Sequence, residues 1–236
     1  MKVFIGWDPR DVTAYQVLVG SILRYAKEPV EILPVKDHEL RWRGLYRRAY
    51  RVDETGQMWD EGDGKPFSTA FSFTRFCVPL MNDFADEWVV FMDADMMFRG
   101  DIGTLFRLAD KSKAVNVVKH VHEPPEDRKM GGLAQTLYQR KNWSSLMLMN
   151  TARCRGLDRD AVNTRPGAWL HGMKWVADDD IGALPEAWNW LEGWSSPEIR
   201  PMNVHFTRGT PDMPGCENVA FAREWLEAAE KLRYAA

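Results

Sequence analysis

The first 35 residues alternate two short apolar runs with one helical stripe of apolar positions. Val3 to Trp7 and Val30 to Val35 predict strands, because each run is short and rich in branched or aromatic side chains. Between them, apolar side chains recur at helical spacing, at Tyr15, Leu18, Val19, Ile22 and Leu23. The order strand, helix, strand predicts parallel strands joined by a right-handed crossover, and ligands bind beyond the carboxyl ends of such strands.

Later in the chain, the pattern predicts two further strands and a closing helix. Residues 88 to 98 begin with a run rich in Val and Phe, which indicates a buried strand, and Leu146 to Met149 predicts another. The closing helix is predicted from Ala222, Trp225, Leu226 and Ala229. Residues 53 to 66 and His122 to Arg140 have little periodicity, so we expect loops there, and either loop could close over a substrate. The whole pattern predicts an α/β protein with one domain spanning residues 1–236.

Composition and charge narrow the class of protein. The chain has 45% hydrophobic residues, as ordinary globular proteins do, and its net charge of -3 excludes wholesale nucleic-acid binding. Cys77, Cys154 and Cys216 are odd in number and widely spaced, which predicts no disulfide framework and favours a reducing cytoplasm. The start of the chain lacks the apolar core of a signal peptide, and no apolar stretch reaches the ~20 residues of a spanning helix. We therefore expect a soluble, cytoplasmic protein.

One stretch, from Lys36 to Arg51, is rich in cations and aromatic side chains. Its other members are Arg41, Arg43, Arg47 and Arg48 with Trp42, Tyr46 and Tyr50. Such a stretch can face an anionic acceptor or make a peripheral contact with a membrane surface. More often it is a solvated helix face, which is the interpretation we favour.

Two carboxylates, Asp93 and Asp95, stand one residue apart at the end of the apolar run of residues 88 to 98. We expect the strand to continue through them, so that its alternation points both to the same side. Like charges placed in this way repel unless a cation joins them, and hard oxygen ligands suit Mg²⁺ or Mn²⁺ bound to substrate phosphate. The flanking methionines make desolvation of unpaired carboxylates costly. The pattern therefore predicts a metal–diphosphate site, and the alternative is that both residues merely cap a turn.

Four landmarks occur in the order and spacing of a known family. They are Asp8 after the first strand, Arg75 shortly before Asp93-Ala94-Asp95, the cluster Asp178-Asp179-Asp180, and His205 in Asn-Val-His-Phe-Thr-Arg-Gly. In this order they resemble glycosyltransferase family 8, the retaining GT-A enzymes that include bacterial lipopolysaccharide galactosyl- and glucosyltransferases and glycogenin. The similarity extends from residue 1 to about residue 210. It implies the Rossmann-like GT-A fold of nucleotide-diphospho-sugar transferases, with a mostly parallel central sheet flanked by helices.

The resemblance also implies roles for these residues. Asp93 and Asp95 match the Asp-x-Asp pair that holds Mn²⁺, or Mg²⁺, on the diphosphate, and His205 matches the third metal ligand. A neutral imidazole suits Mn²⁺ well, although a lone buried histidine is more often part of the core. Arg75 matches an arginine that contacts the donor, where the alternative is a surface salt bridge. Asp8 matches a position that contacts the nucleotide base, where the alternative is a turn former.

Other positions depart from the family pattern. Asp178 to Asp180 align with an Asp-Gln-Asp in which the first acid binds the donor sugar and the Gln lies beneath the anomeric carbon. Asp179 stands at the Gln position, where a carboxylate can stabilise an oxocarbenium ion or act as a nucleophile. Asp178, Asp179 and Arg75 are thus the candidate catalytic residues, unless the register is shifted by one or the acids form a solvated helix N-terminus. Ser144 replaces an Asn near the donor, and Arg208 stands near an expected Lys that reaches the diphosphate.

The implied reaction is the metal-dependent transfer of a hexose from a nucleoside diphosphate sugar, with a UDP-sugar as the expected donor. The anomeric configuration would be retained, and the acceptor would be a hydroxyl of a carbohydrate, a lipid-linked sugar or a protein. Mn²⁺ and Arg208 would stabilise the charge of the leaving diphosphate. Two alternatives stay open, a sugar-nucleotide binding protein without turnover and a nucleotidyltransferase of related fold. The second is disfavoured because residues 6 to 11 lack a Gly-rich loop.

Overall fold

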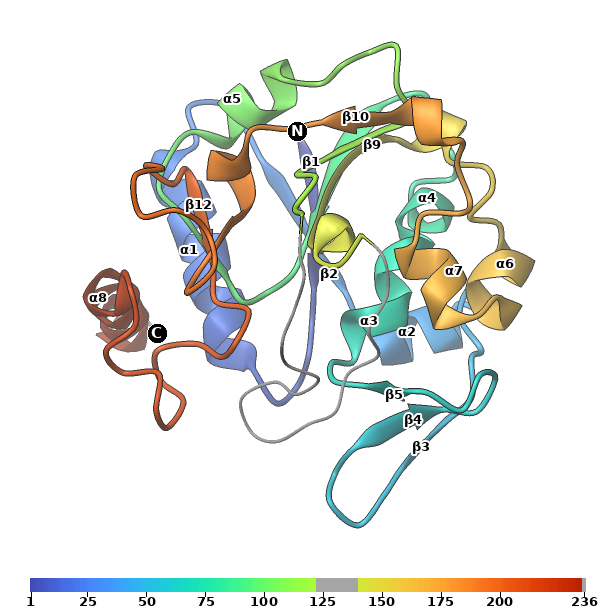
Figure 1. Ribbon diagram of the computed structural model, residues 1–236, viewed down its shortest axis with the longest axis horizontal. Coiled ribbons are helices and arrows are strands. Elements are labelled where there is room, and N and C mark those ends of the chain that lie inside the picture. Colours follow the sequence, from blue (N-terminus) through green and yellow to red (C-terminus); the bar gives the residue numbers. More distant parts are fainter. Residues whose placement is uncertain (122–139, 235–236) are drawn as a thin grey trace.

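The computed structural model describes residues 1–121 and 140–234, which form an α/β fold around a six-stranded sheet (Figure 1). The strands lie in the order β10-β8-β9-β6-β1-β2. Their bounds are β1 Lys2–Gly6, β2 Glu31–Val35, β6 Trp88–Met92, β8 Val115–Val117, β9 Leu146–Asn150 and β10 Ile181–Ala183. The predicted α/β class is therefore confirmed, and the first strand begins and ends one residue before its predicted range.

Five of the six strands run in one direction. β1 is parallel to β2 and β6, and β10 is parallel to β8, whereas β9 is antiparallel to both β6 and β8. The predicted opening unit of two parallel strands joined by a helix is thus present. At one edge of the sheet β1, β6 and β8 end and β9 begins, because Met92 pairs with Ile5 on one side and with Leu146 on the other. We call it the carboxyl edge.

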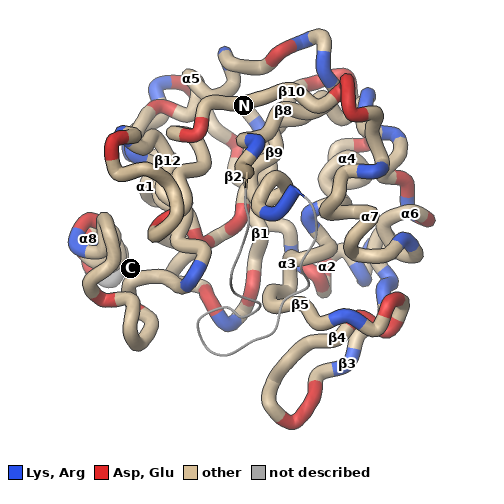
Figure 2. Tube along the Cα trace, viewed as in Figure 1, with Lys and Arg blue, Asp and Glu red and all other residues tan. Residues whose placement is uncertain are grey.

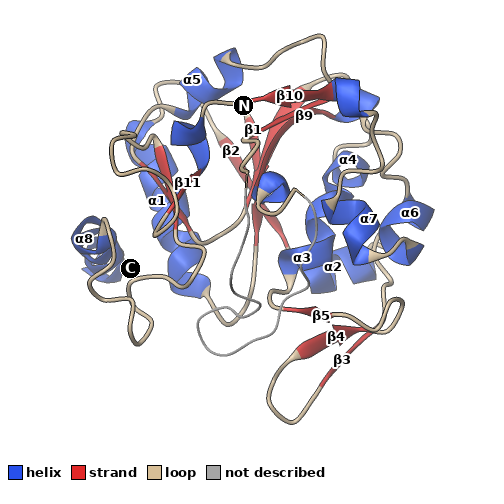
Figure 3. Cartoon of the chain, viewed as in Figure 1, coloured by secondary structure: helices blue, strands red, loops and turns tan. Residues whose placement is uncertain are grey.

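Two smaller sheets accompany the central one. β7, β11 and β12 form a three-stranded sheet in the order β11-β12-β7, and β3, β4 and β5 form an antiparallel sheet that projects from the rest of the fold (Figure 3). The bounds are β3 Tyr50–Val52, β4 Met58–Asp60, β5 Pro66–Phe67, β7 Met96–Phe98, β11 Trp190–Leu191 and β12 Asn203–His205.

Helices flank the central sheet, with α8 lying beyond α1, and short helical turns lead into several strands (Figure 1). The α-helices are α1 Val12–Tyr25, α2 Asp37–Trp42, α3 Phe71–Thr74, α4 Val78–Met81, α5 Ile102–Arg107, α6 Arg159–Thr164, α7 Gly167–His171 and α8 Ala222–Tyr234. The 3-10 turns are η1 Arg75–Cys77, η2 Trp143–Ser145, η3 Thr151–Arg153, η4 Asp178–Asp180 and η5 Glu186–Asn189. Helix α6 begins where the Asp158 carboxylate accepts a hydrogen bond from Ala161 N–H, a common N-cap arrangement.

The two longest helices, α1 and α8, pack against each other. Ala14 and Val17 of α1 form a second apolar core with Trp225 of α8, apart from the main core around the central sheet. This packing rotates the buried face of α1 relative to the predicted stripe. The prediction is therefore wrong at Leu23, which is 54% exposed, and similarly at Leu226 of α8, which is 39% exposed.

The projecting sheet corrects two further expectations. Residues 53 to 66 are not a plain loop, because they include β4, which pairs with β3 and β5. Nor are all the cations before it on a solvated helix face, because Arg48 is buried in an ion pair with Asp60 of β4. Trp42 fits the expectation of exposure, at 89%. The aromatic and basic stretch is thus partly a structural support for the projecting sheet.

The remaining predictions concern cysteines, membranes and loops. All three cysteines are buried and unbridged, as expected. No helix in the described ranges has both the length and the apolar composition needed to cross a bilayer. Acidic and basic residues are interspersed along the chain (Figure 2). The predicted loop from His122 to Arg140 lies outside the described residues, except for Arg140 itself.

Candidate metal centre and adjoining cavities

Asp93 and Asp95 lie at the carboxyl edge, in the bend between β6 and β7. The prediction of one continuous strand through them is wrong, because β6 ends at Met92 and β7 belongs to another sheet. Ala94 between them is 1% exposed and packs in the main core. A hydrogen bond from Asp93 N–H to Ser145 O, 2.9 Å long, fixes the bend against the start of β9. The two carboxylates therefore converge through a bend rather than through strand alternation.

His205 approaches the same bend from the other side. It ends β12, whose pairing with β7 sets His205 opposite Met96, and Phe206 N–H donates to Asp95 O at 2.9 Å. One ligand atom from each of Asp93, Asp95 and His205 lies within 4.8 Å of the other two. His205 Nε2 is 3.2 Å from Asp95 Oδ1. The structure thus brings together all three residues that the resemblance implied as metal ligands.

Asn189, a residue that the sequence analysis did not single out, fixes the orientation of the His205 ring. Its Nδ2 donates to Ser145 Oγ at 2.9 Å and to Asn142 O at 3.3 Å. A backbone carbonyl can only accept, so Oδ1 of Asn189 is the atom that faces His205 Nδ1, at 2.9 Å. Nδ1 therefore carries the proton and donates a hydrogen bond to Asn189 Oδ1.

The orientation of the His205 ring determines which species can bridge His205 Nε2 and the Asp95 carboxylate. With Nδ1 protonated, the Nε2 lone pair points at a carboxylate oxygen, and two acceptors at this separation need a proton or a metal cation between them. The ligand set of two carboxylates and one imidazole is hard, apart from the nitrogen, and suits Mn²⁺ or Mg²⁺. An outer hydrogen bond from the second ring nitrogen, as Asn189 accepts here, is usual for metal-bound histidine.

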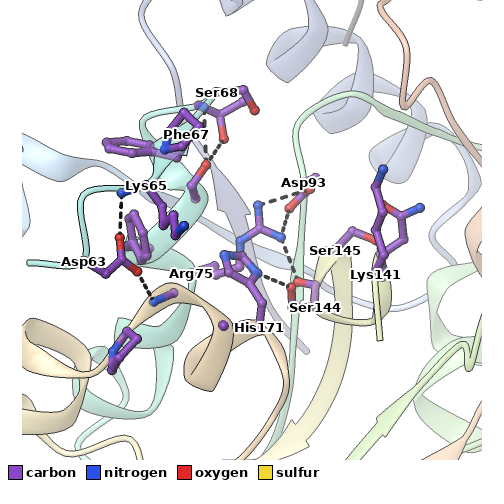
Figure 4. A pocket seen from close by; sticks show the side chains of 18 residues that line it. Asp63, Lys65, Phe67, Ser68, Arg75, Asp93, Lys141, Ser144, Ser145 and His171 are labelled. Atoms are coloured by element: carbon purple, nitrogen blue, oxygen red, sulfur yellow. Dashed lines mark hydrogen bonds and ion pairs between the residues drawn. The ribbon is translucent and has the colours of Figure 1, made fainter. Parts of the chain in front are cut away.

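Arg75 lies beside the cluster and neutralises Asp93. Its Nη1 is 3.0 Å from Asp93 Oδ1 and 3.0 Å from Ser144 O, and Nε donates to Phe71 O at 3.2 Å (Figure 4). The whole residue is only 6% exposed. Its predicted alternative, a surface salt bridge, is therefore wrong, because the guanidinium is held inside the fold against a metal-ligand candidate.

A cavity of about 200 Å³, part of it open to solvent, lies on the Asp93 side of the cluster (Figure 4). We call it the first cavity. Arg75, Asp93 and Ser144 line it, together with His171 of α7, whose Nδ1 lies 2.9 Å from Ser144 Oγ. Asp63 closes another wall and accepts hydrogen bonds from Gly167 N–H of α7 and from Lys65 N–H. The converging polar groups are typical of a small-molecule site.

A second cavity, of about 210 Å³, adjoins the first on the Asp95 side. Ser68 and Thr69 line both cavities, so the two are neighbours on either side of the Asp93–Asp95 bend. The residues that line the second cavity include Asp8, Arg10, Asp11, Phe71, Asp95 and Arg208. The structure therefore brings the predicted residues Asp8 and Arg208 to the same place as a metal-ligand candidate.

Charges in the second cavity are held by short local contacts. Arg208 Nη2 lies 3.0 Å from Glu192 Oε2, and its side chain is 44% exposed. Burial acts to raise the pKa of Asp8, but hydrogen bonds from Arg10 and from Ala70 N–H outweigh it and keep that pKa below its usual value. Burial, with the nearby charge of Asp95, raises the pKa of Asp11 to about 7. A cation bound at the cluster would offset that repulsion.

The Asp178–Asp180 cluster lies elsewhere. It forms η4, just before β10, and Asp180 O accepts a hydrogen bond from Ala114 N–H at the beginning of β8. Because β8 and β10 run parallel, η4 lies where these strands begin, whereas the metal-ligand candidates lie where β6 ends. Asp178 pairs with Arg140 at 2.8 Å, and neither Asp178 nor Asp179 lines the two cavities. The acid cluster thus lies in an exposed helical turn apart from both cavities, and its catalytic role stays a prediction.

Comparison with known proteins agrees with this geometry at the level of fold. No family model matches the chain. Among solved structures, the bifunctional glycosyltransferase WbbM in its apo form matches with a TM-score of 0.65 and 14% identity, over 97% of this chain and 49% of WbbM. The glycosyltransferase GlyE of Streptococcus pneumoniae TIGR4 matches with a TM-score of 0.58 and 14% identity, over 97% and 60%. The chain thus spans about half of WbbM and three-fifths of GlyE.

The galactosyltransferase LgtC, solved in complex with donor and acceptor sugar analogs, is matched almost end to end. The likeness covers 98% of this chain and 96% of LgtC, with a TM-score of 0.59 and 11% identity. A curated relative, Protein CDI of Arabidopsis thaliana, is 39% identical over 237 residues, which cover 98% of this chain and 86% of the relative. The chain therefore has the GT-A glycosyltransferase fold that its resemblance to family 8 implied, and it belongs to the family of Protein CDI.

Proposed function

We propose that the protein is a metal-dependent glycosyltransferase that moves a hexose from a nucleoside diphosphate sugar, expected to be a UDP-sugar, to a hydroxyl acceptor. The observation that supports this most directly is the cluster of Asp93, Asp95 and His205, whose ligand atoms lie within 4.8 Å of one another between two cavities. A diphosphate held at that point would extend in two directions, one for the nucleoside and one for the sugar. The GT-A fold supports the same reading.

The two cavities suit the two halves of a nucleotide sugar. The second cavity, with Asp8 and Arg10, would receive the nucleoside, in keeping with the position of Asp8 in the family resemblance. The first cavity, with Arg75, Ser144 and His171, offers many polar groups to the hydroxyls of a hexose. Arg208, beside Asp95 in the second cavity, would face the diphosphate.

In this reaction Asp93, Asp95 and His205 would hold Mn²⁺, or Mg²⁺. The bound metal supplies Lewis-acid stabilisation of the charge that grows on the leaving diphosphate. Arg75 holds the Asp93 carboxylate in place, and Arg208 would add positive charge on the Asp95 side. Retention of the anomeric configuration needs no strong base, because the leaving phosphate oxygen can take the acceptor proton from the same face. The acceptor would be a carbohydrate, a lipid-linked sugar or a protein.

A donor-hydrolysis screen tests the proposal without knowledge of the acceptor. UDP- and GDP-sugars would be incubated with the protein in Mn²⁺, and after removal of the metal by a chelator. We expect release of nucleoside diphosphate from one donor, only with metal present, and an unchanged anomeric configuration in the released sugar by NMR. Metal-dependent binding with no release, even with sugar acceptors added, would favour a binding protein. Pyrophosphate release from a nucleoside triphosphate would favour a nucleotidyltransferase.

The Asn189 side chain gives a prediction specific to this metal site. Asn189→Ala removes the acceptor of the His205 Nδ1 proton and frees the imidazole to rotate. We expect Mn²⁺ affinity to fall by about 10–100-fold, as for other outer partners of metal-bound histidine. Isothermal titration with Mn²⁺ alone measures this directly. Asn163→Ala in α6 is the matched control, because Asn163 lines neither cavity; an equal loss in both variants would contradict the role of Asn189.

A further inference from the structure

The carboxylate of Asp8 has no acceptor capacity left for a ligand. Oδ1 accepts hydrogen bonds from Arg10 N–H and Arg10 Nε, both 2.9 Å long. Oδ2 accepts from Arg10 Nη2 at 2.6 Å and from Ala70 N–H at 2.8 Å. Each oxygen therefore uses both of its lone pairs, and the residue is 2% exposed. Asp8 is a positioning residue, and its carboxylate holds Arg10.

Arg10 is the member of this pair that a ligand can reach. Its side chain is 48% exposed and lines the second cavity. Nε and one N–H of Nη2 are bound to Asp8, and the other N–H of Nη2 donates to Ser68 O at 2.7 Å. Within the described residues, Nη1 makes no hydrogen bond. Because the bidentate contact uses the opposite edge of the planar guanidinium, the N–H groups of Nη1 point away from Asp8.

We infer that Arg10 determines base specificity by donating these N–H groups to a carbonyl oxygen on the edge of the nucleobase. The inference rests on the proposed function, because it places the nucleoside in the second cavity. A fixed cationic donor favours bases that present a carbonyl, uracil and guanine, over bases that present an amino group in the same place, cytosine and adenine. The donor would thus be a UDP- or GDP-sugar and not a CDP- or ADP-sugar.

The guanidinium cannot adapt to an amino group, because its orientation is fixed at both ends. Asp8 and Ser68 O hold Nε and Nη2, and Ala70 N–H holds Asp8 in turn. An amino group against Nη1 would bring two donors together and, once the bound base excludes water from the cavity, leave both without an acceptor, which costs free energy. A freely rotating lysine at this position would discriminate less, because a single ammonium has no fixed plane.

The test compares two matched pairs of ligands, UDP with CDP and GDP with ADP, by isothermal titration in Mn²⁺. For the natural protein we expect the carbonyl base to bind tighter by about tenfold or more in each pair. Arg10→Met should bring both ratios to about one, since the apolar side chain cannot donate. Arg10→Met also strands the buried Asp8, so the double variant Asp8→Asn/Arg10→Met, which removes the charge as well, is measured beside it. The ratio within one variant is independent of the fraction of folded protein.

Two further arginines serve as controls. Arg223→Met, whose side chain is 94% exposed in α8, should leave affinities and ratios unchanged. Arg208→Met should weaken all four ligands equally, because Arg208 faces the phosphates they share. Ratios near one in the natural protein, or ratios that persist in both Arg10 variants, would overturn the inference and leave the proposed function standing. If none of the four binds with Mn²⁺, the proposed function and the inference both fail.

Discussion

Replacing Asp95 with alanine is expected to lower the metal-dependent release of nucleoside diphosphate by about 10³-fold, equivalent to several kcal/mol of transition-state stabilisation. Asp95 supplies one of three ligand atoms, and Asp93 is already shared with Arg75, so the remaining pair would hold a metal poorly. Removing Asp95 also relieves its repulsion with the carboxylates of Asp93 and Asp11, so the melting temperature should change little. The measurements are the rate of donor hydrolysis at several Mn²⁺ concentrations and a thermal melt of each variant.

The exposed acids of η4 provide the contrast. Asp178→Ala and Asp179→Ala remove side chains that do not line either cavity, so both variants should keep the natural rate within about twofold. The alignment of these acids with a catalytic Asp-Gln-Asp makes the opposite prediction. A loss in Asp179→Ala as large as that in Asp95→Ala would show that η4 reaches the donor during the reaction. Full activity of Asp95→Ala in Mn²⁺ would contradict the metal site.

The sequence predicted the metal-ligand candidates because their convergence depends on simple features. Asp93 and Asp95 follow an apolar run that becomes an interior strand of the sheet, and a pair of acids at the carboxyl end of such a strand lies where ligands bind. His205 could not be placed by its own surroundings, which are those of a core histidine. Only its order relative to the other landmarks singled it out, and pairing between β12 and β7 is what brings it to Asp95.

Asn189 and His171 escaped prediction for a different reason. Each acts through a partner far away in sequence: Asn189 through Ser145 and His205, and His171 through Ser144. The residues next to Asn189 and His171 in the sequence do not indicate that either belongs to a binding site. Arg10 lies in a predicted turn beside Asp8, so the sequence indicated a pair of opposite charges there. It did not indicate which of the two side chains would be buried.

The three acids align with the family's Asp-Gln-Asp in sequence, but in this structure Asp178 and Asp179 line neither cavity. In this fold the segment that reaches the first cavity before β10 is α7, with Gly167 and His171, and not η4. The acids stand immediately before the edge strand β10, and they are solvated there and paired with arginines: Asp178 with Arg140, and Asp180 with Arg153. Local composition cannot place the acids, since three adjacent acids before a short strand suit a donor site and an exposed helical turn alike.

Replacing Arg48 with methionine is expected to lower the free energy of unfolding by about 3–5 kcal/mol at pH 7, the usual cost of removing one partner of a buried ion pair. Arg48 and Asp60 have side chains only 3% and 0% exposed, and their two contacts are 2.6 and 2.8 Å long. Arg48 also donates to Arg165 O at 2.7 Å and lies over the Phe73 ring. Urea unfolding measures the change, and the double variant Arg48→Met/Asp60→Leu should recover most of it because no buried charge is left.

The pH dependence of the stability lost in Arg48→Met shows whether the loss comes from the unpaired charge of Asp60 or from poorer packing. In the natural protein, burial acts to raise the pKa of Asp60, but the hydrogen bonds and charge of Arg48 outweigh it and hold that pKa below its ordinary value. Asp60 therefore contributes stability above its unfolded pKa of about 3.9, and this contribution is lost as the pH falls through the lower folded pKa. Without Arg48, burial alone raises the pKa of Asp60, so the sign reverses and the carboxyl is tolerated only when protonated. The gap in stability between the natural protein and Arg48→Met should hence narrow from pH 7 to pH 4, whereas a gap of constant size would assign the loss to packing against Phe73.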